Sequence, residues 1–423
     1  MNMDYIKRIV DDEINDKLEI MGAIVIRGPK WCGKTTSAKQ VANSILEMQN
    51  PDFKDNYLEL AKIKPSSLLE GDKPRLIDEW QLAPKLWNAV RYAVDKSAIP
   101  GQYILTGSAV PVEDPDMHSG VGRFDFIEMK SMTLFESGES NGTVSLNDIL
   151  NGKSDIDGKT TDFTYEKIAF ALCRGGWPNS IKLEETQALK ISKSYLKLLC
   201  ESDISKIDGV KRNAKLARLI IKSYARQTST IDSNQAMYDD VKANNIEVSE
   251  RTIMDYIDVL KKLYVIDEIE AWNPNIRSKT AIRTSSKKGF VDPSIATAAL
   301  GVSPKELILD VKTYGLLFEN LVNRDLSVYV NKIGGYLNHY RDRYGLECDN
   351  VIHFDDGRYA LVEVKLGGDK VKEAEEHLLE LKGLIATNEK LKEPEFLMII
   401  TAEDLAYTTK SGVHIVPIGC LKD

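Results

Sequence analysis

The chain has 423 residues, 43% of them hydrophobic and 28% charged, with a formal net charge of −8. These are the proportions of an ordinary folded protein, so a mostly disordered or fibrous chain is excluded, and the length predicts two or three domains. The acidic balance excludes a bulk positive field that would hold nucleic acid, so DNA binding would require a local basic patch.

Cysteine usage and hydropathy limit the cellular setting. The five cysteines are dispersed and form no CxxC pair, which argues against a disulfide framework and against a thiolate zinc site. No apolar run approaches the ~18–20 residues of a membrane span. The N-terminus, with acidic residues from Asp11 to Asp16, is unlike a signal peptide. We expect a cytoplasmic protein without a membrane partner.

The first part of the chain alternates short apolar runs with helical patterns. An amphipathic helix is predicted over residues 4–20, and a helical stretch rich in lysine and glutamine is predicted over residues 34–48. Apolar runs occupy residues 23–26, 57–60, 75–78, 102–105 and 124–129. Because these runs lack strict alternation, they are typical of strands covered on both faces, and they predict a parallel α/β sheet.

A phosphate-binding loop lies between the first apolar run and the helix that follows it. The segment Gly28-Pro29-Lys30-Trp31-Cys32-Gly33-Lys34-Thr35 fits G-x-x-x-x-G-K-[ST] in full. Its two glycines let backbone N–H groups face phosphate oxygens, its lysine reaches the β- and γ-phosphates, and its threonine hydroxyl is a ligand for Mg²⁺. We predict that these eight residues and Thr36 bind ATP.

An acidic pair follows the apolar run at residues 75–78. Asp78 ends the run and is predicted to hold Mg²⁺ together with Thr35, and Glu79 is predicted to polarise the attacking water. A surface Asp-Glu pair after a strand would be the structural alternative.

Two further catalytic candidates come later in this part of the chain. Thr106, at the end of the next apolar run, is predicted to sense the γ-phosphate, with Ser108 as the alternate hydroxyl. Arg123 is a candidate arginine finger or sensor, because arginine stabilises charge on a transferring phosphoryl group. A threonine–glycine turn and an ordinary loop arginine are the competing interpretations.

The middle of the chain is helical after a polar stretch at residues 136–162, which we interpret as an insertion at a domain edge. A helix from Ser249 followed by two short strands, at 265–270 and 271–276, would form a winged helix-turn-helix. The helix face is nearly neutral, whereas a basic stripe precedes it at Lys211, Lys215, Arg218, Lys222 and Arg226. That stripe is either a solvated or partner-docking surface or a DNA contact.

The last part alternates strands and helices. A long helix is predicted over residues 311–330, strands over 349–354, 359–366 and 396–401, and a helix over 371–391. Glu319, Asp349, Glu363 and Lys365 resemble the PD-(D/E)xK nuclease constellation, in which carboxylates hold Mg²⁺ and the lysine orients water. The alternative is a nuclease-like fold without cleavage, or a buried cluster of ion pairs.

The motifs together resemble prokaryotic AAA-superfamily ATPases with a C-terminal domain of unknown function. The matching segments are Gly28–Thr35, Leu76-Ile77-Asp78-Glu79-Trp80-Gln81, Ile104–Ser108, Gly122-Arg123, Arg174-Gly175-Gly176-Trp177-Pro178, the Tyr340–Asp349 segment and Glu363-Val364-Lys365. Trp80 departs from the small aliphatic residue usual in that family, and the loop 114–121 and the stretch 136–162 have no clear counterpart. The resemblance implies the nucleotide site and no particular substrate.

We therefore expect an α/β protein of three modules. These are an AAA-type P-loop ATPase domain with a parallel sheet (1–164), a helical and winged-helix-like module (165–276), and an α/β restriction-endonuclease-like domain (277–423). The expected function is Mg²⁺-dependent ATP hydrolysis that drives rearrangement of the later modules. An ATP-gated DNA-binding protein or nuclease, and a nucleotide-dependent adaptor for a protein partner, are the alternatives. Oligomers are compatible with each of them.

Overall fold

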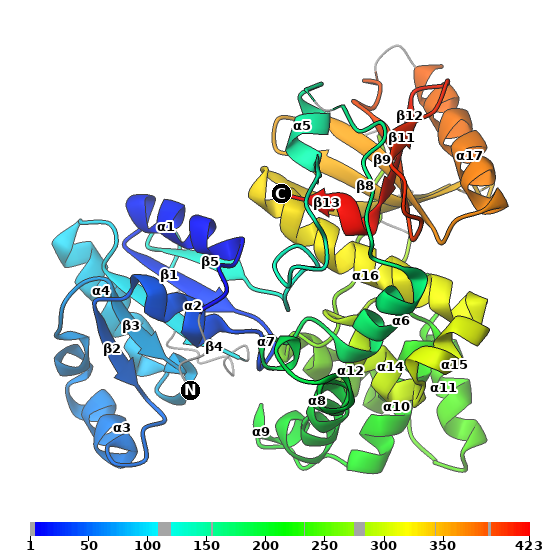
Figure 1. Ribbon diagram of the computed structural model, residues 1–423. Helices are drawn as coiled ribbons and strands as arrows, with labels where there is room; N and C mark the ends of the chain where they lie inside the picture. The colour runs from blue at the N-terminus through cyan, green and yellow to red at the C-terminus, as the bar shows by residue number, and fades with distance from the viewer. Residues whose placement is uncertain are drawn as a thin grey trace. The chain divides into compact units, whose positions relative to one another are not determined.

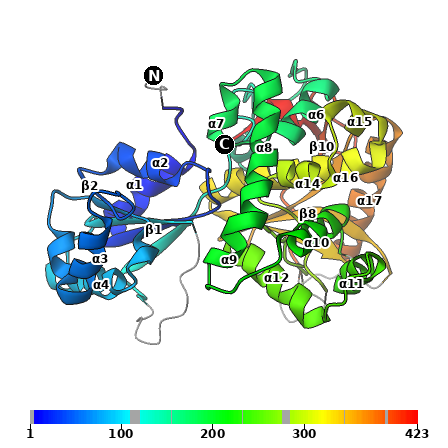
Figure 2. The same ribbon diagram turned by 90° about the horizontal axis from the view of Figure 1, so that it is seen from below.

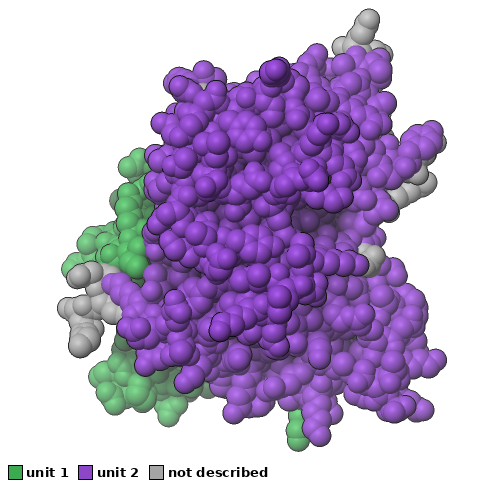
Figure 3. All heavy atoms as spheres, turned by 45° about the vertical axis from the view of Figure 1, so that its right-hand side comes forward, with its two compact units in different colours: residues 1–131, 202–212, 258–265 green, residues 132–201, 213–257, 266–423 purple. Residues whose placement is uncertain are grey.

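A computed structural model describes residues 5–108, 120–153, 155–231, 233–274, 284–342, 344–387 and 391–423. The chain forms two compact units, which Figure 3 distinguishes by colour. Unit 1 comprises Met1–Ser131 with the short segments Ser202–Arg212 and Asp258–Val265, and unit 2 comprises the remainder. Within the described ranges, no helix has the length and apolar character needed to cross a membrane.

Unit 1 is built on a five-stranded parallel sheet in the order β2-β3-β4-β1-β5 (Figure 1). Its strands are β1 (Ala23–Arg27), β2 (Ser44–Glu47), β3 (Arg75–Asp78), β4 (Tyr103–Gly107) and β5 (Phe124–Glu128). Its helices are α1 (Val10–Ile20), α2 (Lys34–Val41), α3 (Lys54–Ile63) and α4 (Lys85–Ser97), with 3₁₀ turns at η1 (Pro65–Leu69) and η2 (Trp80–Leu82). The predicted parallel α/β sheet is confirmed.

Helices cover both faces of this sheet, which explains the uninterrupted apolar strands. One face packs Ile24, Ile26 and Ile104 against α1 and α2. The other packs Val25 and Leu105 against η1, α3 and α4. Because all five strands run in the same direction, the segments that follow their carboxyl ends meet at one edge of the sheet.

Two predicted elements of unit 1 are wrong, and a third begins later than predicted. The helix expected over residues 34–48 ends at Val41, and Ser44–Glu47 continues as an edge strand in which only Leu46 is buried. The run at residues 57–60 lies inside α3 instead of a strand, because Tyr57, Leu58 and Ala61 repeat at helical spacing and pack on one face. The first helix begins at Val10 instead of residue 4.

Unit 2 begins with irregular segments and helices (Figures 1 and 2). These elements are β6 (Val144–Ser145), α5 (Leu146–Leu150), α6 (Tyr165–Arg174), α7 (Pro178–Ile181), α8 (Glu185–Leu198), a π-helical turn η3 (Leu199–Asp203), α10 (Ala214–Arg226), α11 (Asn234–Ala243), α12 (Glu250–Lys262), α14 (Pro293–Leu300) and α15 (Pro304–Leu309). The end of η3, the short α9 (Ile204–Lys206) and the last residues of α12 belong to unit 1.

The C-terminal part of unit 2 is a six-stranded mixed sheet in the order β11-β12-β10-β9-β8-β7. Its elements are α16 (Val311–Lys332), β7 (Gly335–Arg341), β8 (Glu347–Phe354), β9 (Tyr359–Lys365), α17 (Asp369–Ala386), β10 (Leu397–Thr401), β11 (Tyr407–Thr408), β12 (Val413–Pro417), a 3₁₀ turn η4 (Ile418–Cys420) and β13 (Leu421–Lys422). Strands β7, β8 and β9 pair antiparallel, and β10 is parallel to β9 and β12. Helix α17 packs its Leu378 and Leu381 on the sheet, and α16 contacts β7 and β9.

The predicted wing does not form among the described residues. Ile266 bridges to Phe290, Ile269 to Lys287 and Ala271 to His339, so the segment expected as a hairpin pairs with distant parts of unit 2. Residues 275 and 276 of the predicted wing lie outside the described ranges, as do residues 114–119 of the unmatched loop. Helix α12 itself occupies the predicted position.

The polar stretch at residues 136–162 is an integral part of unit 2. Its strand β6 pairs in parallel with β13 at the other end of the chain, and Ser140 Oγ donates a 2.6 Å hydrogen bond to the carbonyl of Leu421. Unit 2 begins at Met132, and the domain bounds 1–164, 165–276 and 277–423 remain predictions.

Candidate functional site

The phosphate-binding loop joins the carboxyl end of β1 to the first residue of α2. Gly28 (φ 151°) and Gly33 (φ 105°) have backbone angles that side chains disfavour. A Cβ atom on Gly28 would lie 2.1 Å from the carbonyl oxygen of Met129, so glycine is required there for packing as well. The loop thus has the strand–loop–helix setting that the motif requires, and the α2 N–H groups face it.

Buried cations hold this loop. Lys34 Nζ donates to the carbonyl oxygens of Gly28 (3.0 Å) and Pro29 (2.7 Å), and its side chain is buried. Arg8 donates to the carbonyl oxygens of Cys32 (2.8 Å) and Lys130 (3.0 Å). Sequence reasoning missed Arg8, because its only local signal is a basic residue at the start of a helical pattern.

The three hydroxyl and carboxyl groups predicted for metal binding and sensing lie together. Asp78 Oδ1 accepts 2.6 Å hydrogen bonds from Thr35 Oγ1 and from Thr106 Oγ1. Strand β4 lies between β1 and β3. Thr106, near the end of β4, therefore lies between the loop that follows β1 and Asp78 at the end of β3. Thr106 is almost fully buried.

Glu79 is fixed next to this group in an unusual backbone conformation. Its φ is 55° and its ψ 45°, the left-handed region, which is uncommon for a residue other than glycine. Gln81 Nε2 donates to its carboxylate, and Ser108 Oγ lies 3.2 and 3.3 Å from its two oxygens. Ser108, the alternate sensor of the sequence analysis, therefore contacts Glu79, whereas Thr106 contacts Asp78.

The donor set fits Mg²⁺. A threonine hydroxyl and one carboxylate, Thr35 and Asp78, are hard oxygen ligands that leave positions for water and phosphate oxygens, as Mg²⁺ prefers. The ion would neutralise phosphate charge at this edge of the sheet when bound with nucleotide.

Arg123 does not join this site. It immediately precedes β5, and its carbonyl oxygen accepts the Ala23 N–H, so it lies at the amino edge of the sheet, opposite the loop. Its Nε lies 2.7 Å from Asp95 Oδ1. Within one chain, five residues of strand separate this arginine from the phosphate-binding loop, roughly 16 Å.

A second loop lysine has a partner that the sequence did not indicate. Lys30 Nζ lies 2.6 Å from Asp203 Oδ1, and the two side chains are 42% and 15% exposed. Asp203 belongs to the short segment Ser202–Arg212 that packs in unit 1. The central part of the chain therefore supplies a carboxylate to the phosphate-binding loop.

The basic stripe is only partly as predicted. Lys211 precedes α10, whereas Lys215, Arg218, Lys222 and Arg226 lie on that helix and are exposed. Arg218 pairs with Glu201 at 3.2 Å and Arg226 with Asp240 at 2.7 Å. Among the residues that the structure describes, Lys215 and Lys222 on α10 have no ion-pair partner.

The four nuclease-like residues converge in unit 2, with a lysine that sequence reasoning missed. Lys365 Nζ lies 2.9 Å from Asp349 and 2.6 Å from Glu363. Lys287 Nζ lies 2.7 Å from Glu319 and 3.4 Å from Asp349. In the part of the chain that the structure describes, no set of three or more His, Cys, Asp or Glu side chains is arranged to hold a metal ion.

Burial and these two lysines set the ionisation of the cluster. Burial raises the pKa of Glu319 to about 7, against the opposing effect of Lys287. Burial and the neighbouring Asp349 raise the pKa of Glu363 well above its ordinary value. For Asp349, burial is outweighed by Lys287 and Lys365, which hold its pKa below the usual range. Asp349, Glu363 and Lys365 line an open cleft of about 850 Å³ beside α17.

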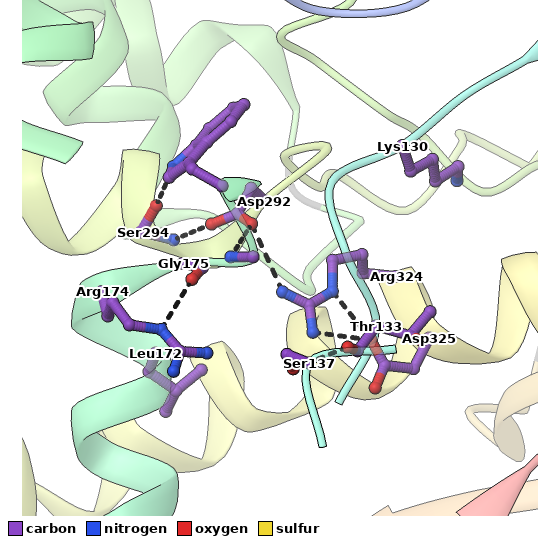
Figure 4. Close-up of polar contacts among 12 residues, drawn as sticks. Lys130, Thr133, Ser137, Leu172, Arg174, Gly175, Asp292, Ser294, Arg324 and Asp325 are labelled. Atoms are coloured by element: carbon purple, nitrogen blue, oxygen red, sulfur yellow. Dashed lines mark hydrogen bonds and ion pairs between the residues drawn. The ribbon is translucent and has the colours of Figure 1, made fainter. Parts of the chain in front are cut away.

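The Gly175-Gly176-Trp177-Pro178 motif belongs to a buried polar network in unit 2 (Figure 4). The Gly176 N–H donates to Asp292 at 2.8 Å, and Trp177 Nε1 donates to Ser294 at 3.0 Å. A Cβ atom on Gly176 would lie 2.1 Å from the carbonyl oxygen of Met132. The motif is therefore explained by close packing.

An arginine joins the carboxylates of this network. Arg324 lies between Asp292 (3.3 Å) and Asp325 (2.7 Å), and all three side chains are buried (Figure 4). Asp325 also accepts the Leu134 N–H at 2.9 Å. Burial raises the pKa of Asp325 to about 6, although Arg324 opposes the shift.

Comparison with protein families divides the chain into three matched regions. Residues 21–137 match the family described as AAA domain. Residues 165–306 match a domain of unknown function, DUF8612, and residues 314–421 match another, DUF4143.

Individual relatives are distant. Uncharacterized proteins Rv2008c of Mycobacterium tuberculosis and Mb2031c of Mycobacterium bovis are 22% identical over 346 residues, which are 81% of this chain and 70% of theirs. The Walker-type ATPase PABY2304 of Pyrococcus abyssi is 14% identical, with a TM-score of 0.42, over 70% of this chain and 96% of that one. A STAND protein of Pyrococcus horikoshii, PH0952, is 12% identical, with a TM-score of 0.22, over 78% of this chain and 50% of that one.

The family match and the loop geometry agree on the N-terminal part of the chain. The loop, the acidic end of β3 and all five strands of the parallel sheet lie within the matched residues 21–137. Residues 21–137 therefore match the AAA domain family and carry the phosphate-binding loop and the acidic strand end, and two regions that match domains of unknown function follow them.

Proposed function

We propose that the protein is a Mg²⁺-dependent ATPase whose hydrolysis drives rearrangement of its C-terminal modules. The observation that carries the proposal is the shared oxygen of Asp78, which accepts hydrogen bonds from the loop hydroxyl of Thr35 and from Thr106 on β4. A loop that only binds nucleotide would need neither Asp78 nor Thr106.

Each side chain then has a distinct part. Lys34 and the N–H groups of the loop would bind the β- and γ-phosphates, and Thr35 and Asp78 would hold Mg²⁺. Glu79, oriented by Gln81 and Ser108, accepts a proton from the attacking water. Thr106 positions Asp78 and responds to the γ-phosphate.

The pair of Lys30 and Asp203 supports coupling to the rest of the chain. Phosphate groups that enter the loop compete with Asp203 for the Lys30 ammonium, because all of them are negatively charged. The segment that carries Asp203 follows α8 and precedes α10, so a change in this pair acts directly on the connection between two helices.

ATP binding and turnover of matched variants test the proposal. Lys34→Ala should abolish ATP binding in calorimetry, whereas Glu79→Gln should retain binding and lose turnover. Lys39→Ala, on the exposed part of α2, is the control and should change neither. Equal ATP affinity of the parent and Lys34→Ala would refute the assignment, and ATP binding without turnover in the parent would favour a nucleotide-dependent adaptor.

The exposed cations of α10 favour a second candidate, an ATP-gated DNA-binding protein. Lys215 and Lys222 project from a helix whose opposite face is buried. If they contact phosphates, affinity for duplex DNA should fall steeply with salt, and each Lys→Ala should reduce that slope by about one unit. Lys372→Ala, on the exposed face of α17, is the control. Absence of binding at low salt would favour a protein partner.

A further inference from the structure

The nuclease-like constellation of unit 2 contains a cation of its own. Lys287 is 6% exposed, and its ammonium contacts Glu319 Oε1 at 2.7 Å, the carbonyl oxygen of Asp349 at 3.0 Å and Asp349 Oδ1 at 3.4 Å. An ammonium has three N–H donors, so these three oxygens use all of them. The ammonium thus lies between the carboxylates of Glu319 and Asp349, where a positive charge offsets both of them.

The backbone keeps Lys287 in this place. Its N–H donates to the carbonyl oxygen of Ile269 at 2.8 Å, and its carbonyl oxygen accepts the Ile269 N–H at 3.0 Å. These two backbone hydrogen bonds to Ile269 fix the position of the Lys287 backbone, from which its side chain extends. Withdrawal of the ammonium would leave Glu319 buried without its cation, which is strongly unfavourable.

The charges of the cluster are also nearly balanced. Three carboxylates, Glu319, Asp349 and Glu363, face two ammonium groups, Lys287 and Lys365. Asp349 Oδ2 additionally accepts the Val364 N–H at 3.0 Å. A divalent cation would enter a site whose negative charge is already compensated and whose Asp349 oxygens already have donors.

We infer that the Lys287 ammonium takes the place of a divalent metal ion in this constellation, so that the cluster joins α16, β8 and β9 as a metal-free ionic core. The Mg²⁺ expected here from the nuclease resemblance therefore does not fit the residues present. Removal of the Lys287 charge should convert the same carboxylates into a divalent-ion site.

A titration with Mn²⁺ tests this inference without nucleotide and without any nuclease substrate. Binding is measured as the decrease of the electron-paramagnetic-resonance signal of unbound Mn²⁺. The parent should bind no Mn²⁺ that depends on Asp349. Lys287→Met, which keeps the aliphatic stem, should gain a bound Mn²⁺ and a Mn²⁺-dependent rise in melting temperature. Both gains should disappear in Lys287→Met/Asp349→Asn.

Lys370→Met is the matched control, because Lys370 lines the same cleft and pairs with Glu373 outside the cluster. It should gain no Mn²⁺. A parent protein whose Mn²⁺ binding is lost in Asp349→Asn would overturn the inference, and so would a folded Lys287→Met that binds none. If Lys287→Met does not fold, Lys287→Gln provides the same comparison, and the parent titration decides by itself.

Discussion

The hydroxyl of Thr35 in the phosphate-binding loop donates a 2.6 Å hydrogen bond to the carboxylate of Asp78, 43 residues further along the chain. Thr35 lies after β1, Asp78 is the last residue of β3, and β4 lies between those two strands. Thr106 at the end of β4 donates to the same oxygen of Asp78. The hydroxyls of the loop and of the central strand β4 therefore meet at one oxygen of Asp78.

Loss of that central hydroxyl should slow hydrolysis more than it weakens binding. We expect Thr106→Val to keep ATP affinity within about twofold and to lower kcat roughly tenfold, the effect of about one hydrogen bond. Thr106→Ser, which restores the donor, should recover most of the rate. Steady-state turnover with parallel calorimetry measures both quantities, and unchanged kcat in Thr106→Val would exclude a sensing role.

Removal of the Asp203 carboxylate should strengthen nucleotide binding. Asp203→Asn leaves the Lys30 charge uncompensated near incoming phosphates, so we expect ATP affinity to rise roughly two- to fivefold at low salt, the scale of a partly exposed ion pair. The effect should shrink as salt increases. In a Lys30→Ala background the same substitution should change little, and an equal gain in that background would contradict the pairing.

Substitution of Arg123 should leave a single chain unaffected. Because Arg123 lies at the amino edge of the sheet and pairs with Asp95, Arg123→Ala should retain ATP binding and turnover in dilute, monomeric protein. A role between subunits would instead appear as turnover per chain that rises with protein concentration and as partial rescue of Arg123→Ala by Glu79→Gln chains. Turnover against concentration, with native mass measurement, distinguishes the two results.

Asp325 should make stability depend on pH. Its pKa is about 6 in the folded protein against an ordinary 3.8, so between these values the folded state holds a proton that the unfolded chain has lost. The free energy of unfolding should therefore fall as pH rises from about 4 to 6, by up to roughly 3 kcal/mol from this group.

Thermal or urea unfolding of the parent and of Asp325→Asn over this pH range isolates the contribution. The free energy of unfolding of the parent minus that of Asp325→Asn should decrease as pH rises toward 6 and then remain constant. Arg324, Asp292 and Glu136 also face the network, so the difference between variants is the informative quantity. Glu376→Gln on the exposed face of α17 should not alter the parent's profile, and a difference that increases with pH would contradict the expected shift.

A side chain at Gly176 should destabilise the protein. A Cβ atom there would lie 2.1 Å from the carbonyl oxygen of Met132, so we expect Gly176→Ala to lower the free energy of unfolding by roughly 1–3 kcal/mol. A Cβ atom at Gly383 in α17 would meet no atom of the described residues within 4 Å, so Gly383→Ala should raise stability by about 0.5–1 kcal/mol. Chemical denaturation compares them, and equal stability of both variants would argue against the close packing.

The local sequence was enough to predict the phosphate-binding loop, because the elements of that loop are contiguous in the chain. The loop, the strand that precedes it and the helix that follows it are contiguous, and glycine and lysine at fixed spacing carry the chemistry within eight residues. The positions of Asp78 and Thr106 could also be predicted, since each ends an apolar run and parallel strands bring their carboxyl ends to one edge.

Short segments whose pattern suits two structures could not be assigned from sequence. Residues 44–47 continue a helical pattern and become a strand because β3 offers them a free edge. Residues 57–60 are apolar enough for a strand and become helix because Tyr57, Leu58 and Ala61 pack on one face. Tertiary contacts decided both, since propensity over four residues is weak.

Contacts between distant residues were decided by the tertiary structure alone. Lys287 lies 32 residues from Glu319 and 62 from Asp349, and no local pattern connects them. The Asp203–Lys30 pair spans 173 residues. The sequence determined which groups could carry charge, and folding decided which of them would neutralise one another, because an ion pair depends on distance in space and leaves no periodic signal along the chain.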